Sequence, residues 1–241
     1  MEMEKEKEKE KEKGQEQEQE QEQEQEQEQE QEQEQEQKQR QAQGQWIEQV
    51  QLQDKAFRFG FVLGRFQHVH AGHELMIDTA LQVCDKVLVL VGSAQLEGTL
   101  RNPYSAEVRM ELLRRLYGER VELAMLPDYS HENDHSHAWG SYLLKAARNY
   151  GRERAYQELD LMVYGSDEER AAWFAKEELN GVAQLALPRD RQPISATRLR
   201  EALVRDDRGL WEQHVNEALH CEYDRLRGLL LQIPEYKAQA K

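Results

Sequence analysis

An apolar run leads through a glycine- and histidine-rich turn into a helical pattern, and this junction constrains the fold more than any other part of the chain. Residues 57–63 are apolar and favour a strand, and residues 74–83 space their apolar side chains as an amphipathic helix does. The ten residues between them read GRFQHVHAGH. A strand, a short turn and a helix form the first part of a βαβ unit, which predicts an α/β fold with a parallel sheet.

The same junction has the chemistry of a phosphate site. The start of a helix offers unpaired N–H groups and the positive end of the helix dipole. His70 and His73 add ring donors there, and Gly72 has no Cβ to block close approach. Arg65 supplies a planar, permanently charged group for phosphate oxygens. We therefore expect this turn to hold phosphate.

A second segment with similar properties follows at residues 194–200, which read ISATRLR. Ser195 or Thr197 can cap the first turn of a helix here. Arg200 falls five residues after Ser195 and so projects near the positive end of that helix. The two helix starts together predict two halves of one polyphosphate cradle.

These two segments resemble the paired signatures of the nucleotidylyltransferase superfamily, H-x-G-H at 70–73 and I-S-x-T-x-x-R at 194–200. In enzymes of that superfamily the α-phosphate of a nucleoside triphosphate is attacked and pyrophosphate is expelled. Either motif alone recurs by accident, but their order and the βαβ pattern between them make the resemblance specific.

The region between the motifs resembles the archaeal-type nicotinamide mononucleotide adenylyltransferases. The matching segments are GSAQ at 92–95, TLRNPYSA at 99–106 with Arg109, and the polar loop from Asp128 to Trp139. The resemblance covers about residues 58–225. The GSD at 165–167 is closer to a branch fused to a Nudix hydrolase, but no Nudix box follows. We therefore expect the adenylyltransferase half alone.

The resemblance implies roles for several of the matching residues. The catalytic residues are His70, His73 and Arg200; the ATP-binding residues are Gly64, Arg65, Phe66, Gly72, Gly165, Ser195 and Thr197; the mononucleotide-binding residues are Arg101, Asp128, Asn133, Asp134 and Trp139. Trp139 is open to two interpretations, a ring that stacks on nicotinamide and a core side chain that anchors a helix to the sheet. The expected cofactor is Mg²⁺ carried with ATP and held mostly by phosphates and water, with no metal site in the protein.

Two features do not follow the pattern of the family, the residue at position 68 and the histidines of residues 131–137. His68 stands where the family usually has proline, which predicts a looser presentation of His70 and His73. Residues 131–137 hold three histidines and two acidic residues, as a metal site does, but the loop lacks an outlying ligand, and we expect a solvated loop.

The first 45 residues form a separate region. They alternate Glu with Lys and then Gln with Glu, without an apolar residue between Met3 and Ala42. Such a segment cannot bury a core, so we expect residues 1–45 to be disordered, serving solubility or docking to a basic partner. This tail carries −10 of the chain's net charge of −15. Residues 46–241 are expected to form one nucleotidylyltransferase domain.

Composition excludes several classes of protein. There is no apolar run long enough for a transmembrane helix and no apolar segment typical of a secretory signal. Cys84 and Cys221 stand far apart, so a disulfide is not expected and the cytoplasm is the expected location. The lack of a basic stripe argues against a nucleic-acid partner. The expected partners are ATP and a mononucleotide, with a homo-oligomer left open.

The apolar patterns predict a Rossmann-like parallel sheet of about five strands flanked by helices, with further helices at the C-terminus. The predicted strands are 58–63, 86–92, 121–126, 159–164 and 182–187, and the predicted helices are 72–84, 105–117, 138–150, 167–178 and from 198 onward. Gly151 is expected to end the helix 138–150. Ligands bind beyond the carboxyl ends of such strands, where the motifs fall.

The sequence therefore predicts an enzyme that joins nicotinamide mononucleotide to the AMP moiety of ATP, giving NAD and pyrophosphate. A different phosphorylated acceptor, nicotinic acid mononucleotide first, would fit the same chemistry. The sequence is also compatible with a catalytically weak nucleotide-binding sensor, indicated by His68, and with a scaffold built around the tail. If the site is degraded, changing His68 to proline is expected to raise turnover.

Overall fold

Five parallel strands form the centre of the computed structural model, which describes residues 55–166, 170–188 and 194–240. The strands are β1 (Phe57–Gly64), β2 (Cys84–Gly92), β3 (Glu122–Leu126), β4 (Leu161–Gly165) and β5 (Ala183–Leu187). Residues 1–45, which we expect to be disordered, lie outside the described residues.

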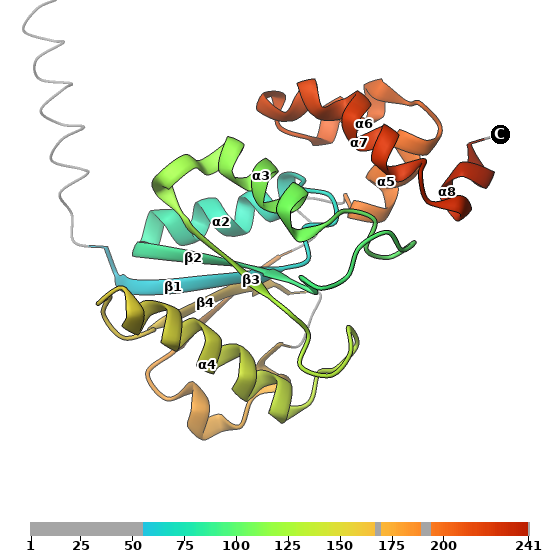
Figure 1. The fold of residues 1–241 in the computed structure, drawn as a ribbon. Coiled ribbons are helices and arrows are strands. Elements are labelled where there is room, and N and C mark those ends of the chain that lie inside the picture. Colours follow the sequence, from blue (N-terminus) through green and yellow to red (C-terminus); the bar gives the residue numbers. More distant parts are fainter. Residues whose placement is uncertain (1–54, 167–169, 189–193, 241) are drawn as a thin grey trace, which may run out of the picture. The chain divides into compact units, whose positions relative to one another are not determined.

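The order of the strands in the sheet is β3-β2-β1-β4-β5 (Figure 1). All four neighbouring pairs are parallel. The chain moves outward from β1 to β3 and then crosses to the other side of β1 for β4 and β5. The order therefore reverses between β1 and β4, and ligands of open α/β sheets bind at this switch point. The predicted five-stranded parallel sheet is confirmed.

The helices connect these strands and follow the last one. They are α2 (Ala71–Val83), α3 (Ala106–Tyr117), α4 (His137–Glu153), α5 (Ala196–Val204), α6 (Arg208–His214), α7 (Tyr223–Leu230) and α8 (Pro234–Gln239). Short 3₁₀ helices lie at η1 (Gly118–Arg120), η2 (Arg170–Trp173), η3 (Lys176–Leu179) and η5 (Glu217–Glu222). Within the described ranges, no helix is long and apolar enough to cross a bilayer.

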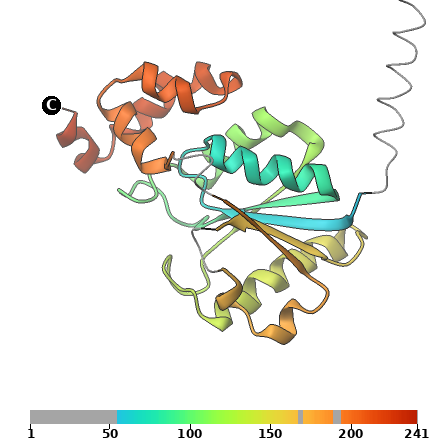
Figure 2. The same cartoon turned by 180° about the vertical axis from the view of Figure 1, so that it is seen from behind.

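Helices cover both faces of the sheet, as Figures 1 and 2 show. Side chains of β1 alternate between two apolar cores. Val62 packs in the core with α2, α3 and the C-terminal helices, whereas Phe61 and Leu63 pack in the core with α4. Because both faces are buried, the central strands are continuous apolar runs instead of alternating ones.

Two predictions about helices are wrong. The described residues of the predicted helix 167–178 form η2 and η3, with residues 167–169 outside the described part. The helix expected to stop at Gly151 continues to Glu153. A Cβ on Gly151 would lie 2.6 Å from the ring of Phe59 on β1. This glycine therefore serves the close packing of α4 on the sheet and does not end the helix.

Two helical glycines provide a matched test of this packing. A Cβ on Gly140 in α4 would collide with the backbone oxygen of Trp173, whereas one on Gly228 in α7 would meet nothing within 4 Å. We expect Gly140→Ala to lower the free energy of unfolding by about 1–3 kcal/mol through overpacking. Gly228→Ala is expected to raise it by up to about 1 kcal/mol through helix propensity. Urea denaturation measures both; equal stability of the two variants would contradict the described packing of α4 on η2.

Candidate active site

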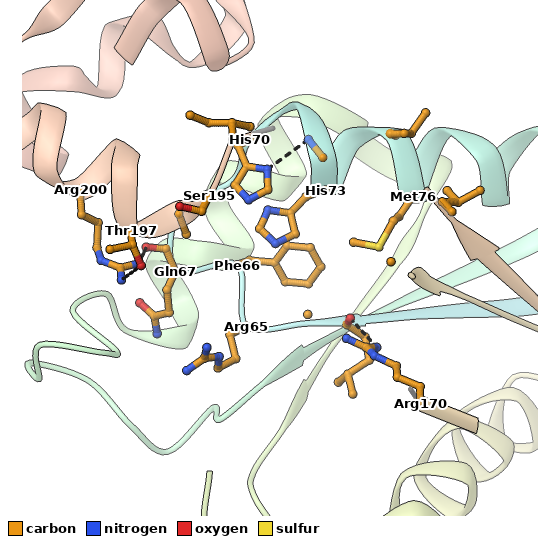
Figure 3. Close-up of a pocket in the computed structure, with 18 of the residues that line it drawn as sticks. Arg65, Phe66, Gln67, His70, His73, Met76, Arg170, Ser195, Thr197 and Arg200 are labelled. Atoms are coloured by element: carbon orange, nitrogen blue, oxygen red, sulfur yellow. Dashed lines mark hydrogen bonds between the residues drawn. The ribbon is translucent and has the colours of Figure 1, made fainter. Parts of the chain in front are cut away.

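A pocket opens at the carboxyl ends of β1 and β4, between the N-termini of α2 and α5 (Figure 3). It brings together all ten residues predicted for catalysis or ATP binding, with Arg101 beside them. These are Gly64, Arg65, Phe66, His70, Gly72, His73, Gly165, Ser195, Thr197 and Arg200. The pocket therefore unites the two motifs, which lie more than 120 residues apart in the sequence.

His70 and His73 present their rings side by side at the start of α2. His70 is the N-cap of this helix, and its Nδ1 accepts a hydrogen bond from the backbone N–H of Gly72 at 3.1 Å. In the neutral ring this acceptor role leaves the proton on Nε2. The two imidazole rings stack with centroids 3.9 Å apart, and Phe66 packs against His73 (Figure 3). Two nitrogen-bearing rings thus adjoin the positive end of the helix dipole.

The turn before α2 holds Phe66 in an unusual backbone conformation. Its φ is +50°, in the left-handed region that residues with a side chain rarely adopt. Its ring covers Gly64, where a Cβ would lie 2.8 Å from the ring. Gly64 therefore allows Phe66 to fold back beneath His73. Backbone strain of this kind concentrates at functional sites.

Arg200 projects from α5 toward the same pocket and is 7% exposed. Its Nε donates to the hydroxyl of Tyr236 at 2.8 Å, Nη2 to Thr197 Oγ1 at 3.1 Å and Nη1 to the carbonyl of Gln67 at 3.5 Å. In the described part of the chain these partners are all neutral. A buried guanidinium without a carboxylate partner is costly unless an anion joins it, so this arrangement fits a phosphate.

The carboxylate of Glu132 lies close to two arginines that were predicted to bind substrates, Arg65 and Arg101. Glu132 is 3.8 Å from Arg65 Nη1 and 3.5 Å from Arg101 Nε. It also accepts a hydrogen bond from Asn102 Nδ2 at 2.7 Å. Glu132 was not among the predicted site residues, although it is the neighbour of Asn133, which accepts from Arg101 Nη1 at 2.5 Å.

The other residues predicted for the mononucleotide do not line this pocket. Asp128 accepts from Ser93 Oγ and Gln95 Nε2, both at 3.0 Å. Asp134 accepts from Ser130 Oγ at 2.5 Å and from the backbone of Ser136 at 2.9 Å. These hydrogen bonds lower the pKa of Asp134 to about 2, and the one from Ser130 contributes most. Both carboxylates thus order the loop before α4, and their contact with a substrate remains a prediction.

Trp139 has the environment of a core side chain. It is 6% exposed and meets Trp173 edge to face, with ring centroids 5.4 Å apart. The ring of His135 stacks on Trp173, with ring centroids 4.5 Å apart. The burial of Trp139 agrees with the anchor between helix and sheet, and stacking of its ring on nicotinamide stays a prediction. The described residues include no group of three His, Cys, Asp or Glu side chains arranged to hold a metal ion, in this loop or elsewhere.

His68 corrects the expectation of a loose turn. It is fully buried, and its Nε2 lies 2.6 Å from the indole Nε1 of Trp211, while Nδ1 lies 2.7 Å from the carbonyl oxygen of Val69. An indole N–H only donates, so Nε2 is the acceptor and Nδ1 carries the proton that is donated to Val69. Burial lowers the pKa of His68 to about 4, which keeps the ring neutral. The side chain that replaces proline therefore fixes the turn.

Arg109 is a structural residue to which the sequence assigned no role. Its fully buried guanidinium donates to the carbonyls of Arg65 at 2.7 Å, Gly92 at 2.8 Å and Ser93 at 3.2 Å. Burial lowers its pKa to about 10, so the group stays charged at neutral pH. Arg109 thereby ties the ends of β1 and β2 to α3.

Comparisons with known proteins agree with this geometry. The family model described as cytidylyltransferase-like matches residues 61–202. The chain is 28% identical over 177 residues to a nicotinamide-nucleotide adenylyltransferase of Thermococcus sibiricus, covering 70% of this chain and 85% of that protein. It is 32% identical over 171 residues to one of Aeropyrum pernix, covering 68% and 87%.

A solved structure is similar in fold. It is a bifunctional NMN adenylyltransferase/ADP ribose pyrophosphatase of Francisella tularensis, complexed with AMP and a manganese ion. The TM-score is 0.55 at 20% identity, and the match covers 76% of this chain and 52% of that one. The chain thus spans about half the length of that protein.

The buried neutral His68 predicts a pH dependence of stability. Its pKa is about 4 in the folded protein against an ordinary 6.5, so the unfolded chain binds the proton more readily. The stability present above pH 6.5 is lost as the pH falls toward 4. The difference between the two pKa values corresponds to about 3 kcal/mol. Urea denaturation across this pH range should show that the free energy of unfolding falls by about 3 kcal/mol more in the wild type than in His68→Gln. Equal losses in the two proteins would contradict the buried neutral ring.

Proposed function

Because the chain belongs to the cytidylyltransferase-like family, we propose that it acts as a nicotinamide-nucleotide adenylyltransferase. It would join nicotinamide mononucleotide to the AMP moiety of ATP and release pyrophosphate. The names of the relatives, which match about 70% of this chain, support this choice. The observation that carries it is the pocket in which His70, His73 and the buried Arg200 meet at two helix N-termini. Synthesis of NAD agrees with the cytoplasmic location that the cysteine content predicts.

The proposed reaction is an in-line displacement at phosphorus. An oxygen of the mononucleotide 5′-phosphate attacks the α-phosphorus of ATP and forms a new P–O bond. The bond from the α-phosphorus to the bridging oxygen of the β-phosphate breaks, and its electron pair leaves with pyrophosphate. This transfer needs no covalent intermediate with the protein. It requires two anions to be held together while the charge of the transition state is neutralised, so positioning and electrostatics dominate.

The residues of the cradle suit this task. We assign the ring donors of His70 and His73, with the N-terminus of α2, to the phosphate oxygens where charge develops. Arg200 is assigned to the leaving pyrophosphate, because the partners of its guanidinium are neutral in the described structure. The donors of Ser195 and Thr197 belong to the same half of the site.

A divalent cation would be carried by the substrate. The residues that line the pocket donate hydrogen bonds and positive charge, which suits phosphate oxygens better than a hard cation. We therefore assign Mg²⁺ to the triphosphate of ATP, where it would reduce the charge that the leaving group must carry. Arg65 is assigned to the phosphates of ATP, and Arg101 is assigned to the phosphate of the mononucleotide.

Pyrophosphate release by the purified full chain with Mg·ATP tests this proposal. We expect turnover to depend on an acceptor and to be faster with nicotinamide mononucleotide than with its acid form, phosphopantetheine or no acceptor. His73→Ala should lower kcat by about a hundredfold or more, as loss of a transition-state donor does. His214→Ala in α6, outside the pocket, is the matched control and should retain activity. ATP binding without turnover would contradict the proposal and favour a sensor.

Glu132 provides a second test, because its carboxylate lies 3.5 Å from Arg101, where the phosphate of the mononucleotide would compete with it, and 3.8 Å from Arg65. Glu132→Gln should lower KM for the mononucleotide about two- to fivefold with little change in kcat, the scale expected of a partly exposed ion pair. Glu153→Gln, in α4 and paired with Arg154, is the control. A higher KM in Glu132→Gln would mean that the carboxylate helps to bind the substrate.

A further inference from the structure

We propose that His68 is a positioning residue that couples the C-terminal helices to the catalytic turn through its hydrogen bond with Trp211. Its two buried hydrogen bonds reach in opposite directions, to α6 and to the backbone of the turn itself. The kinetic consequences given below rest on the proposed function. The hydrogen bond is observed in the described structure and can be tested by itself.

Trp211 is a rigid partner for this contact. It is fully buried, and its ring meets Tyr223 of α7 edge to face, with centroids 5.1 Å apart. The ring of His220 is tilted against the indole, with ring centroids 5.9 Å apart. The indole N–H therefore has a fixed direction that is set by three C-terminal elements. It points at His68, which is 143 residues earlier in the chain.

The position of His68 is transmitted directly to the catalytic histidines. His68 is two residues before His70, and the carbonyl of His70 accepts the first backbone hydrogen bonds of α2, from His73 at 2.8 Å and Glu74 at 3.1 Å. A shift of the turn at His68 would therefore move the N-cap and the first helical turn together. Small displacements of reacting groups cost large factors in rate.

The neighbouring residue is held in the same way. The side-chain amide of Gln67 donates to the carbonyl of Tyr104 at 3.1 Å and accepts from its N–H at 3.0 Å. The carbonyl of Gln67 accepts from Arg200. Arg200 and Trp211 thus hold consecutive residues of one turn. The C-terminal helices set the distance between Arg200 and the two histidines, which must act on the same triphosphate.

The chemistry at position 68 is specific. The site requires an acceptor for the indole N–H and a donor for the carbonyl of Val69. Proline provides neither, and its introduction would leave both buried groups without a partner. Glutamine carries an acceptor and a donor on one terminal amide and can replace the two functions. The residue usual in the family would therefore be harmful in this chain.

Steady-state kinetics of four variants test the proposal. His68→Leu, His68→Pro and Trp211→Phe should each lower kcat by about tenfold to a hundredfold, with a smaller change in KM for the mononucleotide. His68→Gln should stay within about threefold of the wild type, because it restores both hydrogen bonds. Tyr223→Phe is the matched control. It removes a hydrogen bond to Asp206 beside the same indole but does not touch the turn. Its kcat should be unchanged.

The indole N–H provides a readout that does not depend on catalysis. In the full chain labelled with ¹⁵N-tryptophan, the Trp211 Nε1–H resonance should be hydrogen-bonded and protected from exchange. It should keep this state in His68→Gln and lose it in His68→Leu. If the leucine variant does not fold, replacing Trp211 with benzothienylalanine removes the N–H while keeping the ring shape. We then expect the protein with benzothienylalanine at position 211 to have a lower kcat than the wild type.

The possible results separate the two proposals. Wild-type kcat in His68→Leu and Trp211→Phe, or a gain in His68→Pro, would overturn the positioning role. So would a loss in His68→Gln as large as in His68→Leu with the indole resonance intact. If the wild type turns over no acceptor, the proposed function fails. The affinity for ATP, measured by calorimetry, then replaces kcat as the readout. We expect this affinity to fall in Trp211→Phe and to stay unchanged in Tyr223→Phe. Equal affinities of the two variants would overturn the coupling.

Discussion

Buried side chains from distant parts of the chain hold the turn between β1 and α2, and the rest of the site depends on this. Residues 65–70 lie between a strand and a helix, so the regular ladders of the sheet and helix do not fix them. Arg109 binds the carbonyl of Arg65, and Arg200 binds that of Gln67. Trp211 binds the side chain of His68. These donors are buried in low-dielectric surroundings, where hydrogen bonds are strong and an unmet partner is costly.

This framework explains how a strained turn can present two histidines with fixed geometry. Phe66 has a left-handed backbone conformation and packs its ring beneath His73. The helix dipole of α2 and the guanidinium of Arg200 then face one pocket from two directions. Because buried hydrogen bonds fix the position of Arg200 and of the turn, little reorganisation is needed at the moment of reaction. The topological switch point between β1 and β4 provides the opening.

Much of the fold could be predicted from the sequence because its signals are local. Apolar runs located the five strands, and Ser105 caps the helix that it was expected to begin. Of the two candidate caps Ser195 and Thr197, Ser195 is the N-cap of α5. The two segments predicted to bind phosphate could also be recognised, and in the structure both line one pocket. The prediction for Gly151 was wrong, because a glycine that serves close packing looks like a glycine that ends a helix.

The rest of the site depends on pairings that no local pattern contains. The support of Arg200 by Tyr236, the carboxylate of Glu132 between two arginines and the clamp of Arg109 on three carbonyls all join distant segments. His68 was expected to loosen the turn because only the loss of proline was visible. Its partner Trp211 lies 143 residues away.

The central claim is that the N-termini of α2 and α5 form one cradle for a triphosphate. A crystal structure of the full chain with a non-hydrolysable ATP analogue and Mg²⁺ tests it most directly. The account predicts that the phosphates lie between His70, His73 and Arg200, with the metal ion on phosphate oxygens and water. A nucleotide bound elsewhere, or one whose phosphates contact only one of the two helix N-termini, would contradict it.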